Sequence, residues 1–145
     1  MPLFLKLGFA FNIFEKNTIF IIEKKLNENN KDEVNHTMKI TINNKEYNIN
    51  LEDNDTVKSL IKILPIEIAM SELNGNEKYF YLNNNLPTNS INPKYITKGD
   101  VMLYGNNCLV IFYKSFETPY SYTKIGHIDN LDDLGSGSIK VKMDN

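Results

Sequence analysis

The sequence predicts a mainly β domain, built as a closed β-barrel of about eight strands with one or two short helices capping it. Short runs in which apolar and polar residues alternate recur along the chain, as in IKVKM at 139–143. Turns rich in asparagine and glycine separate these runs. A stretch at 57–64 instead spaces its apolar residues like a helix. Many short strands and little helix favour a sheet that closes on itself.

The segment that follows residue 37 predicts a hairpin and then a helix. Two alternating runs flank the polar turn Asn43-Asn44, which is the pattern of a β-hairpin. Asn54 is placed to cap a helix whose apolar residues recur at i, i+3, i+4 and i+7. This helix ends before Pro65. Its apolar stripe is expected to cover an open end of the barrel.

Further strands are expected in the rest of the chain, which brings the total to about eight. They are 66–70, 77–82, 101–104, 108–113, 124–128 and 139–143. The run at 108–113 is continuously apolar, as expected for a strand covered on both faces. The loops at 83–98 and 114–123 are long, and long loops often carry function. Residues 129–134 predict a short acidic helical turn.

The composition limits what this domain is expected to do. The chain has 145 residues and a formal charge of −2, and its basic residues are all lysines, with no arginine. No basic face that could hold a phosphate backbone is expected, so we predict no nucleic-acid binding. Cys108 is the single cysteine, which excludes an intrachain disulfide and fits a reducing, cytoplasmic location.

Residues 1–37 are expected to form a tail or linker, separate from the domain at 38–145. Lys6, Asn12 and the polar segment 15–17 interrupt its apolar residues, so stable membrane insertion, which needs about 18 to 20 apolar residues, is not expected. Export is disfavoured because no basic n-region or small-residue cleavage site is evident. Two origins are considered: translation from an upstream start codon, with Met38 as the natural start, or a genuine tail that associates with membranes or moves freely.

The order of the predicted elements, with three sequence segments, resembles the cyclophilins, and most closely the small bacterial cyclophilin-like domain proteins. The segments are Leu64-Pro65, MSELNGNEKYFYL at 70–82, and GDVMLYGNNCLVIFYKSFETPYSYTKIG at 99–126. Together they cover most of residues 38–145. The resemblance implies a cyclophilin-like barrel over this range.

The resemblance also implies a groove, which in active cyclophilins isomerises prolyl bonds. There an arginine polarises the carbonyl on the proline side, and its segment maps near Ile66–Met70, where this chain has none. The Gln-x-Phe strand maps onto Leu109–Phe112. Thr-Pro-Trp becomes Thr118-Pro119-Tyr120, and the following pocket histidine has no equivalent. Lysine does not reproduce the rigid charged fork of arginine, so isomerase activity is disfavoured.

Ligand binding in the same groove would survive these losses. The side chains expected at its walls are Met70, Tyr79, Tyr81, Asn106, Phe112, Tyr120 and Tyr122. A tyrosine combines a large apolar surface with a hydroxyl group, so it suits ordinary packing as well as a ligand groove. Three or four tyrosines around one concavity would favour the groove. For Asn106 the turn at 105–107 is the preferred interpretation, with a pocket rim as the alternative.

Other reactive groups in the sequence have simpler explanations. Cys108 precedes four apolar residues and has no adjacent base, so it is expected to pack in a core. His127 lies within a strand pattern with no second histidine at ligand spacing, so no metal or other cofactor is predicted. The acids at 129–133 fit an exposed helical turn. Residues 135–138 lack the lysine of a phosphate-binding loop and predict a turn.

The sequence supports three functional hypotheses. The first is a non-catalytic module whose aromatic groove binds a peptide or a small molecule. The second is a weak peptidyl-prolyl cis-trans isomerase that works without the usual arginine. The third is an interaction or accessory protein, which predicts a flat surface where the groove would be.

Overall fold

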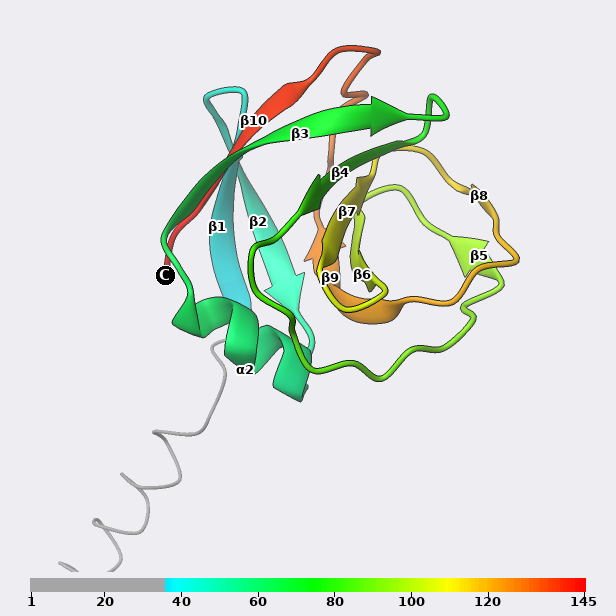
Figure 1. Cartoon of the computed structure of the whole chain (residues 1–145). Coiled ribbons are helices and arrows are strands. Elements are labelled where there is room, and N and C mark those ends of the chain that lie inside the picture. Colours follow the sequence, from blue (N-terminus) through cyan, green and yellow to red (C-terminus); the bar gives the residue numbers. More distant parts are fainter. Residues whose placement is uncertain (1–35) are drawn as a thin grey trace, which may run out of the picture. The chain divides into compact units, whose positions relative to one another are not determined.

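The computed structural model describes residues 36–145, and eight of its strands close an antiparallel barrel (Figure 1). The elements are β1 (Thr37–Ile42), β2 (Lys45–Leu51), α2 (Asp55–Lys62), β3 (Ile66–Leu73), β4 (Glu77–Tyr81), β5 (Tyr95–Ile96), β6 (Asp100–Tyr104), β7 (Cys108–Phe112), β8 (Phe116–Glu117), β9 (Thr123–Ile128) and β10 (Ile139–Met143). Around the barrel the order is β1-β10-β3-β4-β7-β6-β9-β2. The predicted barrel is therefore confirmed. The expected tail at 1–37 lies outside the described residues except at its end, where β1 begins with Thr37.

The hairpin of β1 and β2 forms because two asparagines accept a left-handed backbone. Asn43 and Asn44 have φ angles of 47° and 69°, which asparagine tolerates better than most residues. This two-residue turn sets the register, in which Ile42 lies opposite Lys45. The alternating side chains Ile40 and Ile42 then point into the barrel and are buried.

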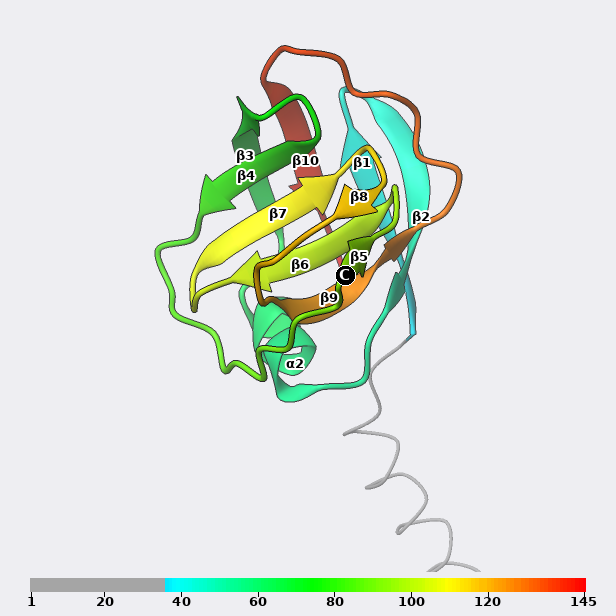
Figure 2. The ribbon, with the colours of Figure 1, turned by 90° about the vertical axis from the view of Figure 1, so that its right-hand side faces the viewer.

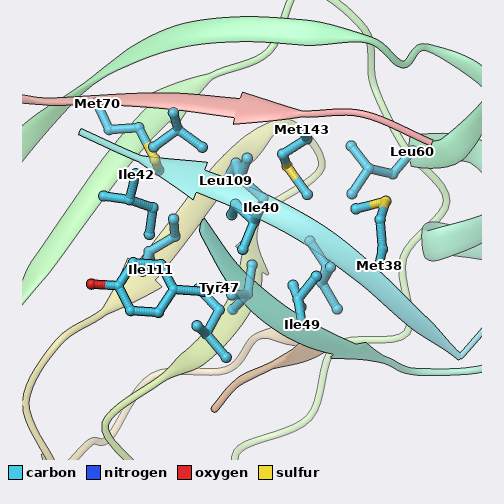
Figure 3. Packing of buried hydrophobic residues seen from close by; sticks show 14 of the residues in the cluster. Met38, Ile40, Ile42, Tyr47, Ile49, Leu60, Met70, Leu109, Ile111 and Met143 are labelled. Atoms are coloured by element: carbon cyan, nitrogen blue, oxygen red, sulfur yellow. The ribbon is translucent and has the colours of Figure 1, made fainter. Parts of the chain in front are cut away.

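The helix α2 covers one end of the barrel, as its apolar stripe predicts. The Asn54 side chain accepts a hydrogen bond from the Val57 amide at 2.8 Å, which caps the helix. Val57 and Leu60 are buried in the same cluster as the inward-facing strand residues. In Figure 3 the Leu60 side chain lies next to Met38 and Met143 at this end of the core.

A buried lysine, Lys78, lies on β4 among the residues of the barrel. Lys78 is fully buried and donates hydrogen bonds to the Glu72 carboxylate at 2.5 Å and to the carbonyl oxygens of Gly135 and Gly137 at 2.6 Å each. Its ammonium also lies 4.8 Å from the centre of the Tyr113 ring. The Tyr113 hydroxyl donates to Glu72 at 2.7 Å. The buried charge of Lys78 is tolerated because each of the three N–H donors of its ammonium has an acceptor.

A second, smaller hydrophobic cluster lies on the outside of the barrel, over β6 and β7. Its buried members are Ile96, Met102, Cys108, Val110, Phe112 and Tyr122. The loops that carry β5 and β8 cross this face and cover it, as Figure 2 shows. β7 is thus covered on both faces, which explains why its five residues are all buried.

Three connections differ from the sequence-based expectation. Residues 129–134 form no helical turn, because Asn130 has a φ of 54° and Asp132 accepts bonds from Lys45 at 2.6 Å and Tyr47 at 2.8 Å. Within the described residues α2 is the single helix. The loops at 83–98 and 114–123 contain the short paired strands β5 and β8.

Candidate functional site

A cavity of about 530 Å³ opens on the outer face of the barrel, between β4 and the loop at 116–122. This volume falls in the range of small-molecule and peptide-side-chain pockets. Its lining residues come from the end of β3, the β3–β4 turn, β4, β6, β7 and the 116–122 loop. They are Leu73, Asn74, Asn76, Glu77, Tyr79, Tyr81, Tyr104, Cys108, Val110, Phe116, Glu117, Thr118, Pro119, Tyr120 and Tyr122.

Strand alternation builds the first wall. Side chains of β4 point alternately into and out of the barrel, so Glu77, Tyr79 and Tyr81 face outward while Lys78 is buried inside. The Tyr79 and Tyr81 rings meet edge to face, with centroids 5.8 Å apart. The strand β7 pairs with β4, and its residues form the floor of the cavity beside this wall. In this pairing Val110 lies opposite Tyr79.

Aromatic packing on the outer cluster holds the second wall, the loop at 116–122. The rings of Phe116 and Tyr122 lie 5.6 and 5.5 Å from the Phe112 ring. The backbones of Tyr122 and Ile91 exchange hydrogen bonds of 2.8 and 2.9 Å, which tie this loop to the neighbouring one. Tyr104 on β6 contacts Tyr120 and Tyr122, with centroids 6.3 and 5.7 Å away.

Four of the seven predicted wall residues meet in this cavity. The cavity is lined by Tyr79, Tyr81, Tyr120 and Tyr122, and also by Tyr104. The sequence-based criterion for a groove, as opposed to ordinary packing, is three or four tyrosines around one concavity, and this cavity has five. The flat surface required by the third hypothesis is absent from this face of the described residues.

The other three predicted residues lie elsewhere. Met70 points into the barrel interior and is fully buried, because it shares the inward face of β3 with Ile68. Phe112 lies beneath the cavity, where Phe116 and Tyr122 cover it. Asn106 belongs to the β6–β7 turn, the preferred interpretation, and its carbonyl accepts from the Leu86 amide at 2.7 Å.

Sequence reasoning missed several lining residues, including Tyr104 and the two carboxylates Glu77 and Glu117. Strand alternation in 100–104 places Tyr104 on the outer face with Met102, so this residue could have been found. Glu117 could not have been found from the sequence, because its position depends on the pairing of β8 with β5.

The charged side chains that line the cavity are both acidic. Burial first, and then the negative charge of Glu72, raise the pKa of the Glu77 carboxyl above its ordinary value. Burial is also the main cause that raises the pKa of the Cys108 thiol and of the Tyr122 hydroxyl, and the Glu77 charge adds to both shifts. The carboxyl groups of Glu77 and Glu117 are thus the acidic groups of the cavity lining, and the raised pKa keeps Cys108 a protonated thiol at neutral pH.

The remaining polar groups give no metal centre in residues 36–145. No three side chains of the metal-binding types His, Cys, Asp and Glu gather there. His127 lies on β9, and its Nδ1 is 2.9 Å from the Asp100 carboxylate on β6. In the same part of the chain, no helix is long and apolar enough to cross a membrane.

A closed antiparallel barrel, with an outer-face cavity walled by a Thr-Pro-aromatic loop, defines a protein of the cyclophilin type. A family model described as the cyclophilin-like family matches residues 40–144, and the chain belongs to this family. Neither the curated proteins nor the solved structures contain a match to the sequence. The family thus agrees with the closed barrel.

Proposed function

We propose that this domain is a non-catalytic binding module that holds a peptide or a small molecule in the tyrosine-lined cavity. The exposure of its rim carries the proposal. Tyr81, Tyr104 and Tyr120 are 61%, 47% and 58% exposed, and the exposed Leu73 stands beside them. Large apolar side chains that remain exposed around one concavity indicate a surface that a partner covers.

The charge of the cavity argues against prolyl isomerisation. Active cyclophilins are expected to polarise a carbonyl oxygen with an arginine, and this chain contains no arginine. The charged groups that line the cavity are the carboxylates of Glu77 and Glu117. A carboxylate repels the partial negative charge that develops on a carbonyl oxygen, so it cannot replace the arginine.

Two measurements on the full chain test this proposal. Amide NMR spectra recorded with acetylated tetrapeptides and with aromatic fragment-sized compounds should show shifts confined to β4, Tyr104 and residues 116–122. Tyr81→Ser should weaken this binding, whereas Tyr95→Ser should not, because Tyr95 is also more than half exposed but does not line the cavity. If no compound shifts the cavity residues, the proposal fails.

The second measurement is a protease-coupled assay on a peptide with an internal Ala-Pro bond. The expected result is a rate indistinguishable from that of the uncatalysed reaction. A rate comparable with active cyclophilins would overturn the non-catalytic assignment and leave the cavity as an active site.

A further inference from the structure

The cavity combines negative charge with aromatic rings. Of its lining residues two are glutamates, five are tyrosines, and none is a lysine. The absence of lysine from the lining is informative because about one residue in nine of this chain is a lysine. An anionic ligand would meet repulsion here, and a neutral one would leave the carboxylates without compensation.

Glu77 is a partly buried carboxylate without a partner in residues 36–145. No described residue donates a hydrogen bond or supplies an ion pair to its side chain, although the side chain is partly buried. Its neighbour Glu72, in contrast, is bonded to both Lys78 and Tyr113. A partly buried, unpaired carboxylate at the edge of a cavity is stabilised by any cation that enters.

The tyrosines supply the second half of a cation site. The face of an aromatic ring is electron-rich and attracts a cation within about 6 Å of the ring centre. The edge-to-face pair Tyr79–Tyr81 stands on the β4 wall, and the pair Tyr104–Tyr120 stands on the opposite side at an interplanar angle of 82°. In such pairs the two ring faces point in different directions, so the walls present several faces to an occupant.

We propose that the cavity recognises an organic cation whose charge is carried by an alkyl-substituted ammonium group. This inference rests on the proposed ligand-binding function and names the chemistry of the ligand. An alkylated ammonium is weakly hydrated and contacts ring faces all round, whereas an unsubstituted ammonium must exchange its three strong hydrogen bonds to water. The five tyrosines and the partly buried, unpaired carboxylate of Glu77 match the first kind of cation.

Titration of the full chain with choline, followed by amide NMR, tests this inference. The matched probe is the carbon isostere of choline, in which a quaternary carbon replaces the nitrogen and removes the charge. Choline should shift the amides of β4 and residues 116–122, and the isostere should bind about tenfold more weakly, as expected when two or three ring faces lose a cation.

Two substitutions with matched controls locate the cation. Glu77→Gln and Tyr81→Leu should each weaken choline binding about three- to tenfold and leave the isostere unaffected. Glu67→Gln and Tyr95→Leu are the controls, since both residues are exposed and neither lines the cavity. Unchanged choline affinity in Glu77→Gln and Tyr81→Leu, with a native amide spectrum, would overturn the inference.

The source of the cation is resolved by a second set of probes. A short acetylated peptide with one trimethyllysine is compared with the same peptide carrying unmodified lysine. Tighter binding of the trimethyllysine peptide than of both choline and the unmodified peptide identifies a peptide ligand, and tighter binding of choline than of either peptide identifies a small molecule; both support the inference. Equal binding of choline and its isostere refutes cation recognition but keeps the proposed binding function. No shift in the cavity with any probe overturns the inference, while the peptide and fragment screen decides the function separately.

Discussion

Replacing Lys78 by methionine should destabilise the barrel more than any other single change to a lysine in residues 36–145. Methionine is unbranched and of similar length, so it keeps the apolar contacts of the lysine stem while removing its charge and its three donors. The Glu72 carboxylate would keep the side-chain hydrogen bond from Tyr113 but lose the ammonium group. Its side chain is 22% exposed, so water can only partly replace the lost ammonium.

The size of this effect follows from the burial of the pair. Removing one partner of a buried ion pair costs about 3–5 kcal/mol, whereas an exposed pair contributes about 0–1 kcal/mol. The carbonyl oxygens of Gly135 and Gly137 belong to an exposed loop and can be rehydrated. We therefore expect a loss near the lower limit, about 3 kcal/mol in the free energy of unfolding.

Urea unfolding followed by circular dichroism measures this loss. Lys39→Met is the matched control, because Lys39 forms an ion pair with Glu46 at 3.3 Å while both side chains are more than half exposed. It should leave the unfolding midpoint unchanged. Combining Lys78→Met with Glu72→Gln should recover part of the loss, with a coupling energy of about 1–3 kcal/mol.

The pH dependence gives an independent check. Burial raises the pKa of Glu72, but the bonds from Lys78 and Tyr113 outweigh it, and the net shift is below the ordinary value of 4.5. The stability that this shift contributes is therefore present above pH 4.5 and is lost as the pH falls through the folded-state pKa. The difference between wild type and Lys78→Met should narrow on acidification. A loss below about 1 kcal/mol at neutral pH, or a difference that widens in acid, would refute the reasoning.

Three further outcomes are expected. Gly126→Ala should cost about 1–3 kcal/mol in urea unfolding, because the added Cβ overlaps the backbone oxygen of Asn50; Gly137→Ala, with open space at that position, should cost much less. Burial first, and then the hydrogen bond to a carboxylate, raise the pKa of Tyr113 to about 12, so the stability from its protonated form is complete below pH 10.0 and is lost through about pH 12. A tyrosinate absorbance step near pH 10 that disappears in Tyr113→Phe would contradict this. Cys108 should react with a thiol reagent far more slowly in native than in unfolded protein, since burial and then a nearby carboxylate raise its pKa; equal rates would show that the thiol is accessible.

The strands of the barrel could be predicted because alternation is a local property of the sequence. The hairpin turn at Asn43-Asn44 and the cap at Asn54 also depend only on neighbouring residues. The strands β5 and β8 contain two residues each, which is too short for any periodicity. They exist because two loops distant in sequence pair with each other over the outer cluster.

The sequence predicted most of the tyrosines of the candidate site, but it did not predict which face of each strand points outward. Alternation shows that Ile68 and Met70 share a face of β3, yet it does not state whether that face points inward or outward. The family resemblance predicts Met70 at the groove, but Met70 lies opposite Ile139 of β10 and packs in the core. Tyr79 and Tyr81 face outward because they alternate along β4 with Lys78, whose side chain is fully buried and hydrogen-bonded.

The outer cluster has a consequence for how a ligand would enter and leave. The wall formed by residues 116–122 is held to the barrel by the outer cluster, which has six buried side chains, and by the pairing of β5 with β8, which have two residues each. The structure that must open to release this wall is therefore far smaller than the barrel. Sub-global opening of residues 91–96 and 116–122 should therefore occur while the eight-stranded barrel stays intact. Hydrogen exchange at Ile96 and Phe116 should be faster than at Leu109, and an occupied cavity should slow it selectively at the first two.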